Sequence, residues 1–232
     1  MQPLLNVDGG ELDDEPLELY ALADVIHVAC GGHAGDEASM ERVTQACADV
    51  GTRVGAHPSY EDREGFGRRA QTVAPEALAG SIAAQCSRLL AVAKRAGIVI
   101  ASMKPHGALY HAANADDALA RACVDGAVRT LGSTIAIVGP AGGALERAAR
   151  SANVSFQREA FADRGVRADG SLVPRGEPGA LVVDPAIAAA RTRELVARGD
   201  VDTLCIHGDT PGAVTIARAV RAALGPKAPE PA

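Results

Sequence analysis

Short apolar runs alternate with longer Ala-rich stretches along the whole chain. The short runs contain β-branched residues and have the length of strands, and their alternation with helical stretches is typical of βα units around a parallel sheet. The pattern predicts seven strands, at residues 3–8, 24–30, 52–56, 98–103, 133–138, 154–160 and 202–207. It predicts helices at residues 36–50, 75–96, 115–131, 141–152, 184–198 and 211–224.

The chain contains no linker, low-complexity tract or internal repeat, so we predict one domain over residues 1–224. Residues 225–232 read GPKAPEPA, and we expect a disordered tail there because prolines cannot continue the preceding helix. Residues 161–183 form a connection that is too long for an ordinary αβ loop. The charged segments of this connection indicate a functional loop.

Polar residues follow nearly every predicted strand. In an open sheet only the residues at the switch point share a crevice, whereas a barrel brings all the strand ends around one mouth. We therefore predict an α/β fold, a single-domain seven-stranded (β/α) barrel of the TIM-like type. The polar residues concerned are Asn6, Asp8, Glu11, His33, Asp36, His57, Lys104, His106, Glu159, Asp163, His207 and Asp209.

The composition argues against several classes of protein. The 232 residues carry a formal net charge of −6 and only 3% aromatic side chains, which disfavours nucleic-acid binding by charge or by base stacking. No run approaches the roughly 18 apolar residues of a membrane span, and the first residues do not read as a signal peptide. Five widely spaced cysteines without a C-x-x-C pair disfavour a zinc or redox motif. We expect a reduced, cytoplasmic protein that binds neither nucleic acid nor membrane.

Four of the six histidines lie at predicted strand ends beside glycine or proline, namely His33, His57, His106 and His207. Any one of them alone can be explained as a histidine that backbone groups satisfy in a tight turn. Four such placements favour a shared catalytic or metal-binding pocket. His27 falls inside a strand, where we expect a core or wall residue.

Two further residues have the placement that chemistry at a strand end requires. Asp8 precedes two glycines, so it either stabilises their turn or faces the pocket as a base, a metal ligand or an orienter of a histidine. Asn6 points to the same face of the strand, which favours the inward interpretation. Lys104 precedes a proline after an apolar strand and is suited to neutralise a carboxylate, a phosphate or an oxyanion.

Glu11 and Arg63 are each open to two interpretations. Glu11 either joins the pocket or belongs to the solvated acidic run that follows it. Arg63 lies in EDREGFGRR, which is either a solvated charge run or an anion clamp.

Several common catalytic and nucleotide-binding motifs are missing from the sequence. The glycine-rich GPAGG at residues 139–143 has neither the G-x-G-x-x-G spacing nor a Walker lysine. There is also no G-x-S-x-G elbow and no H-E-x-x-H pair, so serine hydrolase and zincin activities lack support.

Six sequence blocks together resemble the LamB/YcsF family, which is also named after the A subunit of 5-oxoprolinase. They run in order from residue 6 to residue 214 and read NVDGGE, ACGGHAGD, GAHPSYEDREGFGRR, KPHGALY, FADRGVRADGSLVPR and IHGDTPGAV. The chain departs from the usual family pattern at Leu4, Gly32, His111 and Val166. These departures bear on detailed specificity more than on the fold.

The resemblance implies a barrel related to the glycoside hydrolase/deacetylase superfamily. It also implies a hydrolase of a cyclic amide bond, which opens 5-oxo-L-proline to L-glutamate with ATP as co-substrate and with two partner subunits, B and C. Among the family's motif residues we expect a catalytic role for Asp8, His57, Lys104, His106 and His207. We expect Asn6, Glu11, His33, Asp36, Arg63, Asp163, Arg164 and Asp209 to bind substrate or support the site.

Two alternatives remain open from the sequence. In one, Asp8, His33 and His106 bind a divalent metal that activates water for deacetylation or amide hydrolysis, in addition to any Mg²⁺ that accompanies ATP. In the other, the chain is a non-catalytic subunit of a lactam-hydrolysing complex. The four converging histidines argue against a mere scaffold.

Overall fold

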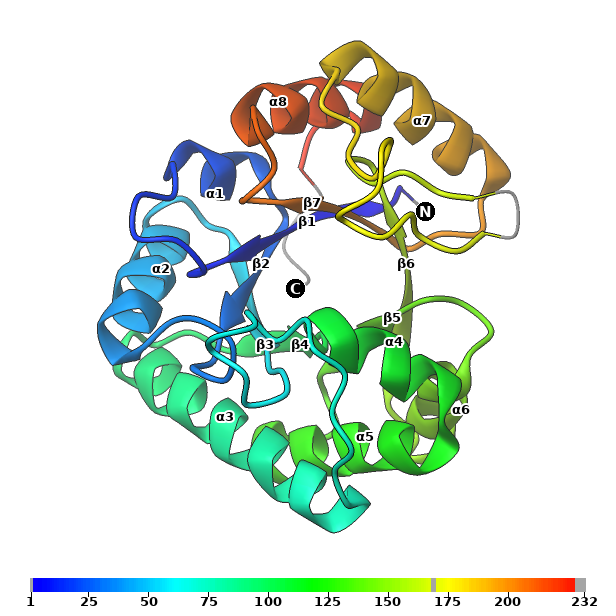
Figure 1. Cartoon of the computed structure of the whole chain (residues 1–232). Helices are drawn as coiled ribbons and strands as arrows, with labels where there is room; N and C mark the ends of the chain where they lie inside the picture. The colour runs from blue at the N-terminus through cyan, green and yellow to red at the C-terminus, as the bar shows by residue number, and fades with distance from the viewer. Residues whose placement is uncertain (1, 168–169, 228–232) are drawn as a thin grey trace.

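Seven parallel strands form a closed barrel at the centre of the molecule (Figure 1). The computed structural model describes residues 2–167 and 170–227. Neighbouring strands pair in chain order, and the last strand pairs with the first. The strands are β1 (Leu4–Gly9), β2 (Val25–Ala29), β3 (Arg53–His57), β4 (Ile100–Met103), β5 (Ala136–Gly139), β6 (Ser155–Phe161) and β7 (Thr203–His207).

Helices surround the barrel on its outside (Figure 1). The prediction of a seven-stranded barrel is confirmed, and each predicted strand and helix has a counterpart within a few residues. Two short helices, α1 and α4, were not predicted. The helices are α1 (Glu18–Leu22), α2 (Glu37–Asp49), α3 (Pro75–Arg95), α4 (Gly107–Ala115), α5 (Asp117–Leu131), α6 (Ala144–Ser151), α7 (Pro185–Arg198) and α8 (Ala213–Leu224).

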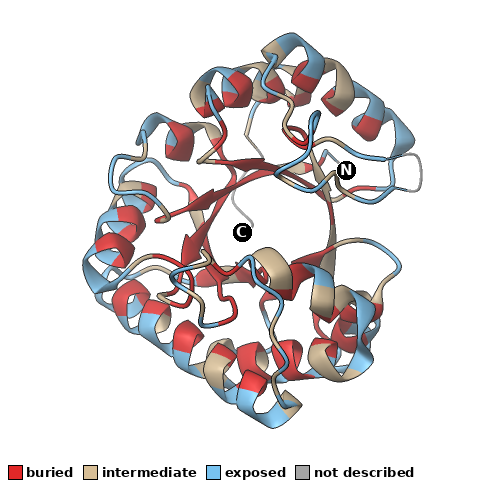
Figure 2. Cartoon of the chain, in the orientation of Figure 1, coloured by how far each residue is buried: buried red, intermediate tan, exposed pale blue. Residues whose placement is uncertain are grey.

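The alternation of residues along β1 shows how the strands build two environments. Leu5 and Val7 are fully buried in the hydrophobic core, while Asn6 and Asp8 lie on the opposite face of the strand. Asn6 reaches Thr203 and Glu159 inside the barrel. Figure 2 shows the complementary pattern in the helices, which are buried toward the barrel and exposed on their outer faces. The barrel interior is therefore polar, and the apolar core lies between strands and helices.

The seam between β1 and β7 closes the barrel. Leu4 lies opposite Thr203, and Asp8 at the end of β1 lies opposite His207 at the end of β7. The register therefore places two candidate catalytic residues side by side.

The long connection after β6 lies at the cavity rather than away from it. Two antiparallel bridges, between Arg164 and Leu181 and between Val166 and Leu172, organise it, and Arg164, Val166 and Leu172 line the cavity. Figure 1 shows this segment in yellow beside β6 and β7. Its position agrees with the expectation of a functional loop.

Two sequence predictions concern the end of the chain and membrane insertion. Of the expected disordered tail, residues 228–232 lie outside the described part, whereas Lys227 donates a hydrogen bond to Thr52 Oγ1 at 2.8 Å. Within the described residues, no helix combines the length and apolar character that crossing a membrane requires.

Candidate active site

A cavity of about 980 Å³ opens at the carboxyl ends of the strands. This volume is at the upper end of the range typical of small-molecule sites. The predicted catalytic residues Asp8, His57, Lys104, His106 and His207 all line the cavity, so the expectation that they share one mouth is confirmed.

Lys104 forms a buried ion-pair network in the wall of the cavity. Its Nζ lies 2.5 Å from Asp8 Oδ1 and 3.1 Å from Glu159 Oε1, and it donates to Asn6 Oδ1 at 2.9 Å. Burial raises the pKa of Asp8, but the charges of His57 and Lys104 outweigh burial and hold the pKa well below its ordinary value. Burial lowers the pKa of Lys104, but the charges around it, led by Asp8, raise the pKa well above normal. Both groups are therefore ionised at neutral pH.

A second polar layer lies next to this network. His27 Nδ1 donates to Asn6 Oδ1 at 3.2 Å, since that oxygen can only accept, and His27 Nε2 then accepts from the Ser102 hydroxyl at 3.0 Å. His27 is 1% exposed, and burial lowers its pKa. This buried position agrees with the expectation that His27 is a core or wall residue.

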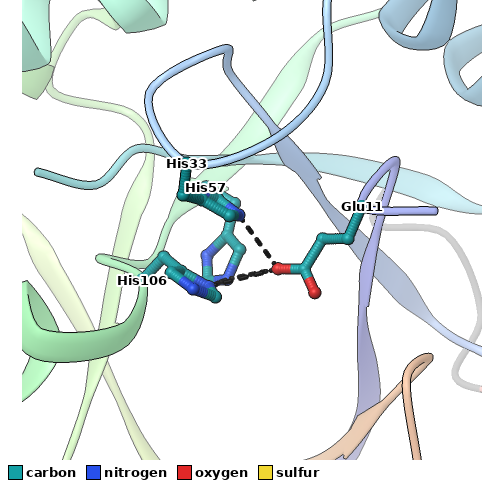
Figure 3. A group of neighbouring side chains, drawn as sticks. All are labelled: Glu11, His33, His57 and His106. Carbon is teal, nitrogen blue, oxygen red and sulfur yellow. Dashed lines mark hydrogen bonds and ion pairs between the residues drawn. The ribbon is translucent and has the colours of Figure 1, made fainter. Parts of the chain in front are cut away.

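Glu11 forms a compact cluster with His33, His57 and His106 (Figure 3). Glu11 Oε1 lies 3.0 Å from His33 Nε2, 3.1 Å from His106 Nδ1 and 3.8 Å from His57 Nε2. His57 Nε2 is also 3.3 Å from Asp8 Oδ2, which links the cluster to the Lys104 network. Burial raises the pKa of Glu11, but its contacts with His106 and His33 outweigh burial and lower the pKa well below normal.

Local structure explains why Glu11 points inward. The Glu15 carboxylate accepts hydrogen bonds from the backbone N–H groups of Gly10 at 2.7 Å and Glu11 at 2.8 Å, and from the hydroxyl of Tyr20 at 2.6 Å. Gly10 adopts a φ of 71°, a conformation that glycine favours. The resulting turn after β1 directs Glu11 toward the histidines.

Asp163 and His207 form a dyad next to Asp8. His207 Nδ1 lies 3.0 Å from Asp163 Oδ1, and the other oxygen accepts from Thr210 Oγ1 at 2.7 Å. Burial lowers the pKa of His207, but the charge and hydrogen bond of Asp163 outweigh burial and raise the pKa above normal. Because Asp163 engages Nδ1, the Nε2 atom is left on the cavity side, 3.9 Å from Asp8 Oδ2.

Arginines gather at the rim of the cavity. Arg68 and Arg175 both pair with Asp209, at 2.7 and 3.2 Å. Arg164 is 6% exposed and donates to the carbonyl oxygens of Ala180 and Val173. Within the described part of the chain, no carboxylate forms an ion pair with Arg164, so its charge is available to an anion in the cavity.

Two predicted supporting residues, Asp36 and Arg63, take no part in the Lys104 network, the Glu11 cluster or the Asp163–His207 dyad. Asp36 caps α2 by accepting from Ser39 N at 2.8 Å. Arg63 Nη1 donates to the carbonyl oxygens of Gly35 at 2.7 Å and Gly31 at 3.3 Å, which joins the loops after β2 and β3. Both residues have structural roles in this conformation.

Two residues of the site lie outside the prediction from the sequence, Glu159 and Tyr110. Glu159 belongs to the predicted strand-end residues but not to the predicted site residues, and it contacts both Lys104 and Asn6. Tyr110 lines the cavity from the unpredicted helix α4. The alternation of residues along β6 was the available signal for Glu159, while Tyr110 had none beyond its place in KPHGALY.

Of the four departures from the family pattern, His111 and Val166 line the cavity. At Gly32, an added Cβ would come within 2.4 Å of Gln85 Oε1 and 2.5 Å of Ser59 Oγ. The side chains of Gln85 and Ser59 therefore occupy the space next to this glycine.

Comparisons with known proteins agree with this architecture. The sequence pattern of the LamB/YcsF family matches residues 10–230. The 5-oxoprolinase A subunit of Streptomyces avermitilis is 43% identical over 95% of this chain and 94% of that protein, and the protein of the same name from Methylococcus capsulatus is 40% identical over 94% and 90%. The crystal structure of a lactam utilization protein from Thermus thermophilus has a TM-score of 0.88 at 34% identity, and the match covers 97% of this chain and 96% of that one. This chain belongs to the LamB/YcsF family.

Proposed function

We propose that this chain is the barrel subunit of an ATP-dependent 5-oxoprolinase, which opens 5-oxo-L-proline to L-glutamate together with partner subunits B and C. The names of the relatives support the substrate and the existence of a complex. The cavity supports a small-molecule substrate, since acidic, basic and histidine side chains converge there. Five free, buried cysteines support a reducing, cytoplasmic location.

The carbonyl group of a five-membered lactam must be activated before water can attack it, because the lactam is a resonance-stabilised amide. Transfer of the terminal phosphoryl group of ATP to the amide oxygen makes the ring carbon electrophilic. Water then adds to this carbon, the C–N bond breaks as the ring nitrogen takes a proton, and the resulting acyl phosphate is hydrolysed to glutamate and phosphate. The site must therefore move protons and bind anions.

The Asp163–His207 dyad is the observation that carries the proposal. Asp163 orients the imidazole through Nδ1, so His207 Nε2 is positioned to take a proton from water and to pass one to the leaving nitrogen. Asp8 stays ionised beside it and stabilises the protonated imidazole. Such proton transfer contributes roughly 10²–10⁴-fold to a rate.

The cationic groups of the cavity supply the anion-binding half of the reaction. Arg164, with Arg68 and Arg175 at the rim, is suited to hold the substrate carboxylate or a phosphoryl group, because guanidinium groups bind both in a bidentate manner. Lys104 forms ion pairs with Asp8 and Glu159, so its role is to keep both carboxylates ionised and in position.

The test is an assay of 5-oxoproline-dependent ATP hydrolysis and glutamate release, with the chain alone and with the candidate subunits B and C. We expect little turnover by the isolated chain and coupled turnover by the assembled complex. Replacing His207 by Ala in the complex should lower turnover by at least about a hundredfold. Full coupled turnover by the isolated chain, or by the complex that contains His207→Ala, would contradict the proposal.

A further inference from the structure

We propose that Glu11, His57 and His106 bind a divalent transition-metal ion, with His33 as a fourth ligand. This inference does not depend on the proposed lactam chemistry. It rests on the direction of the ring nitrogens, the spacing of the donor atoms and the burial of the cluster.

The hydrogen bonds of two histidines fix which nitrogens carry lone pairs. His57 Nδ1 lies 2.8 Å from the carbonyl oxygen of Lys104, and His106 Nε2 lies 3.0 Å from that of Phe66. A carbonyl oxygen only accepts, so both of these nitrogens carry hydrogen. The inner nitrogens, His57 Nε2 and His106 Nδ1, are then unprotonated in neutral rings, yet they lie 3.0 Å apart. Two lone pairs that face each other at this distance repel, so a positive charge, either a metal ion or a proton, must lie between or beside them.

The spacing of the donor atoms fits one shared ion. Metal–donor bonds of about 2.0–2.1 Å in a tetrahedral arrangement place the donors roughly 3.3 Å from one another. In the cluster, Glu11 Oε1 lies 3.0 Å from His33 Nε2, 3.1 Å from His106 Nδ1 and 3.8 Å from His57 Nε2. One ligand atom from each of the four residues lies within 4.8 Å of every other. Glu11, His57 and His106 need little movement to close around an ion.

The surroundings also match those of a metal site. Ligating histidines ordinarily donate their outer N–H to a carbonyl or carboxylate, as His57 and His106 do. His33 Nδ1 is a buried atom without a hydrogen-bond partner, and its ring stacks on that of His106 with 3.6 Å between the centroids. A metal ion lies in the plane of each imidazole ring that binds it, and two parallel stacked rings have no common point in their planes. His33 must therefore tilt away from His106 to become a ligand.

A second group of potential ligands, Asp8, Cys205 and His207, is less suited to a cation. Lys104 Nζ lies 2.5 Å from Asp8 Oδ1 and 3.3 Å from Cys205 Sγ, so its positive charge occupies the place that an ion would take. The Glu11 cluster has no lysine or arginine in contact within the described residues. Three imidazoles and one carboxylate favour Zn²⁺, Fe²⁺ or Ni²⁺ over Mg²⁺ or Ca²⁺, which prefer oxygen ligands.

A proton is the competing explanation for the contact between His57 and His106. An imidazolium at His106 would donate to both Glu11 and Phe66 and would need no metal. The two explanations predict different stoichiometries of bound metal, different Co²⁺ spectra and different effects of metal on the melting temperature.

The experiment treats the purified full chain with a chelator and titrates it with Zn²⁺ by calorimetry and with Co²⁺ by visible absorption. We expect about one equivalent of either metal, a Co²⁺ spectrum of low-symmetry four- or five-coordination, and a rise in melting temperature on binding. Loss of a direct ligand should exceed the roughly 10–100-fold effect of an outer-shell partner. His57→Ala and the milder Glu11→Gln should each weaken binding by at least about a hundredfold.

His111→Ala is the matched control, because His111 lines the same cavity but lies outside the cluster. It should bind metal as the unaltered chain does. Failure of the chain to bind either metal would overturn the proposal and support the imidazolium. Equal weakening by His111→Ala would reveal adventitious binding, and weakening confined to Asp8→Asn would place the ion in the second group. Each measurement is made without substrate, so its failure is separate from failure of the proposed function.

Discussion

Lys104 offers the most direct test of the electrostatics of the barrel interior. Its side chain is 2% exposed and compensates the buried carboxylates of Asp8 and Glu159. Replacing Lys104 by Met keeps the aliphatic bulk but removes the lysine charge that pairs with the buried carboxylates of Asp8 and Glu159. Breaking a buried pair in this way costs about 3–5 kcal/mol of the free energy of unfolding. At roughly 2–4 °C per kcal/mol for a domain of this size, the melting temperature should fall by about 6–20 °C.

The loss of stability caused by Lys104→Met should depend on pH, and the direction of this dependence follows from the two pKa shifts. The pKa of Asp8 is lowered in the folded state, so its contribution to stability is present at neutral pH and disappears as the pH falls through the folded pKa. The pKa of Lys104 is raised, so its contribution persists until the pH rises through that value. The difference between Lys104→Met and the unaltered chain should therefore be largest between about pH 4 and pH 10 and shrink in acid.

Thermal unfolding followed by circular dichroism across this pH range measures the effect. Lys94→Met is the control, because Lys94 is exposed near the end of α3 and its replacement should change stability by no more than about 0.5 kcal/mol. Adding Asp8→Asn to Lys104→Met should recover part of the lost stability. Equal melting temperatures for the two lysine variants at pH 7 would refute the argument.

Three further predictions concern the site. Asp163→Asn removes the charge that raises the pKa of His207, so the His207 titration measured by NMR should shift to lower pH; an unchanged titration would contradict the assigned dyad. Asp8→Ala should lower coupled turnover in the reconstituted complex by at least about a hundredfold while circular dichroism still shows a folded chain. Gly107→Ala should destabilise the chain by about 1–3 kcal/mol in thermal melts, because φ is 57° and the new Cβ would lie 2.5 Å from a carbonyl oxygen. Gly80→Ala in α3 meets no atom within 4 Å and should instead be neutral or stabilising.

The fold was predictable because its signal is periodic and local. Each strand has apolar residues on the face toward the helices, and β1 shows the same pattern through Leu5 and Val7. The helix α4 escaped prediction because it begins with Gly107 immediately after a proline–histidine pair, a combination that indicates a turn in sequence. The five-residue helix α1 is too short to show a periodicity.

The site was predictable at strand ends and less so in loops. Lys104 was expected to neutralise an anionic group and does so, but only the folded barrel shows that Glu159 is one of its partners. Glu11 resembled the first member of a solvated acidic run, and its inward direction depends on the hydrogen bonds of Glu15 within the turn. Such side-chain directions follow from tertiary contacts and have no counterpart in the spacing of residue types.

The seam between β1 and β7 has a consequence for the order in which the protein forms. Leu4 and Thr203 are 199 positions apart, so β1 can pair with β2 early in synthesis, whereas its other edge must wait for nearly the entire chain. Contacts of such long range are formed late and slowly because loop closure must precede them. Asp8 and His207 face each other across this seam. A nascent chain therefore brings Asp8 and His207 together only after β7 has been synthesised, and the site is incomplete until then.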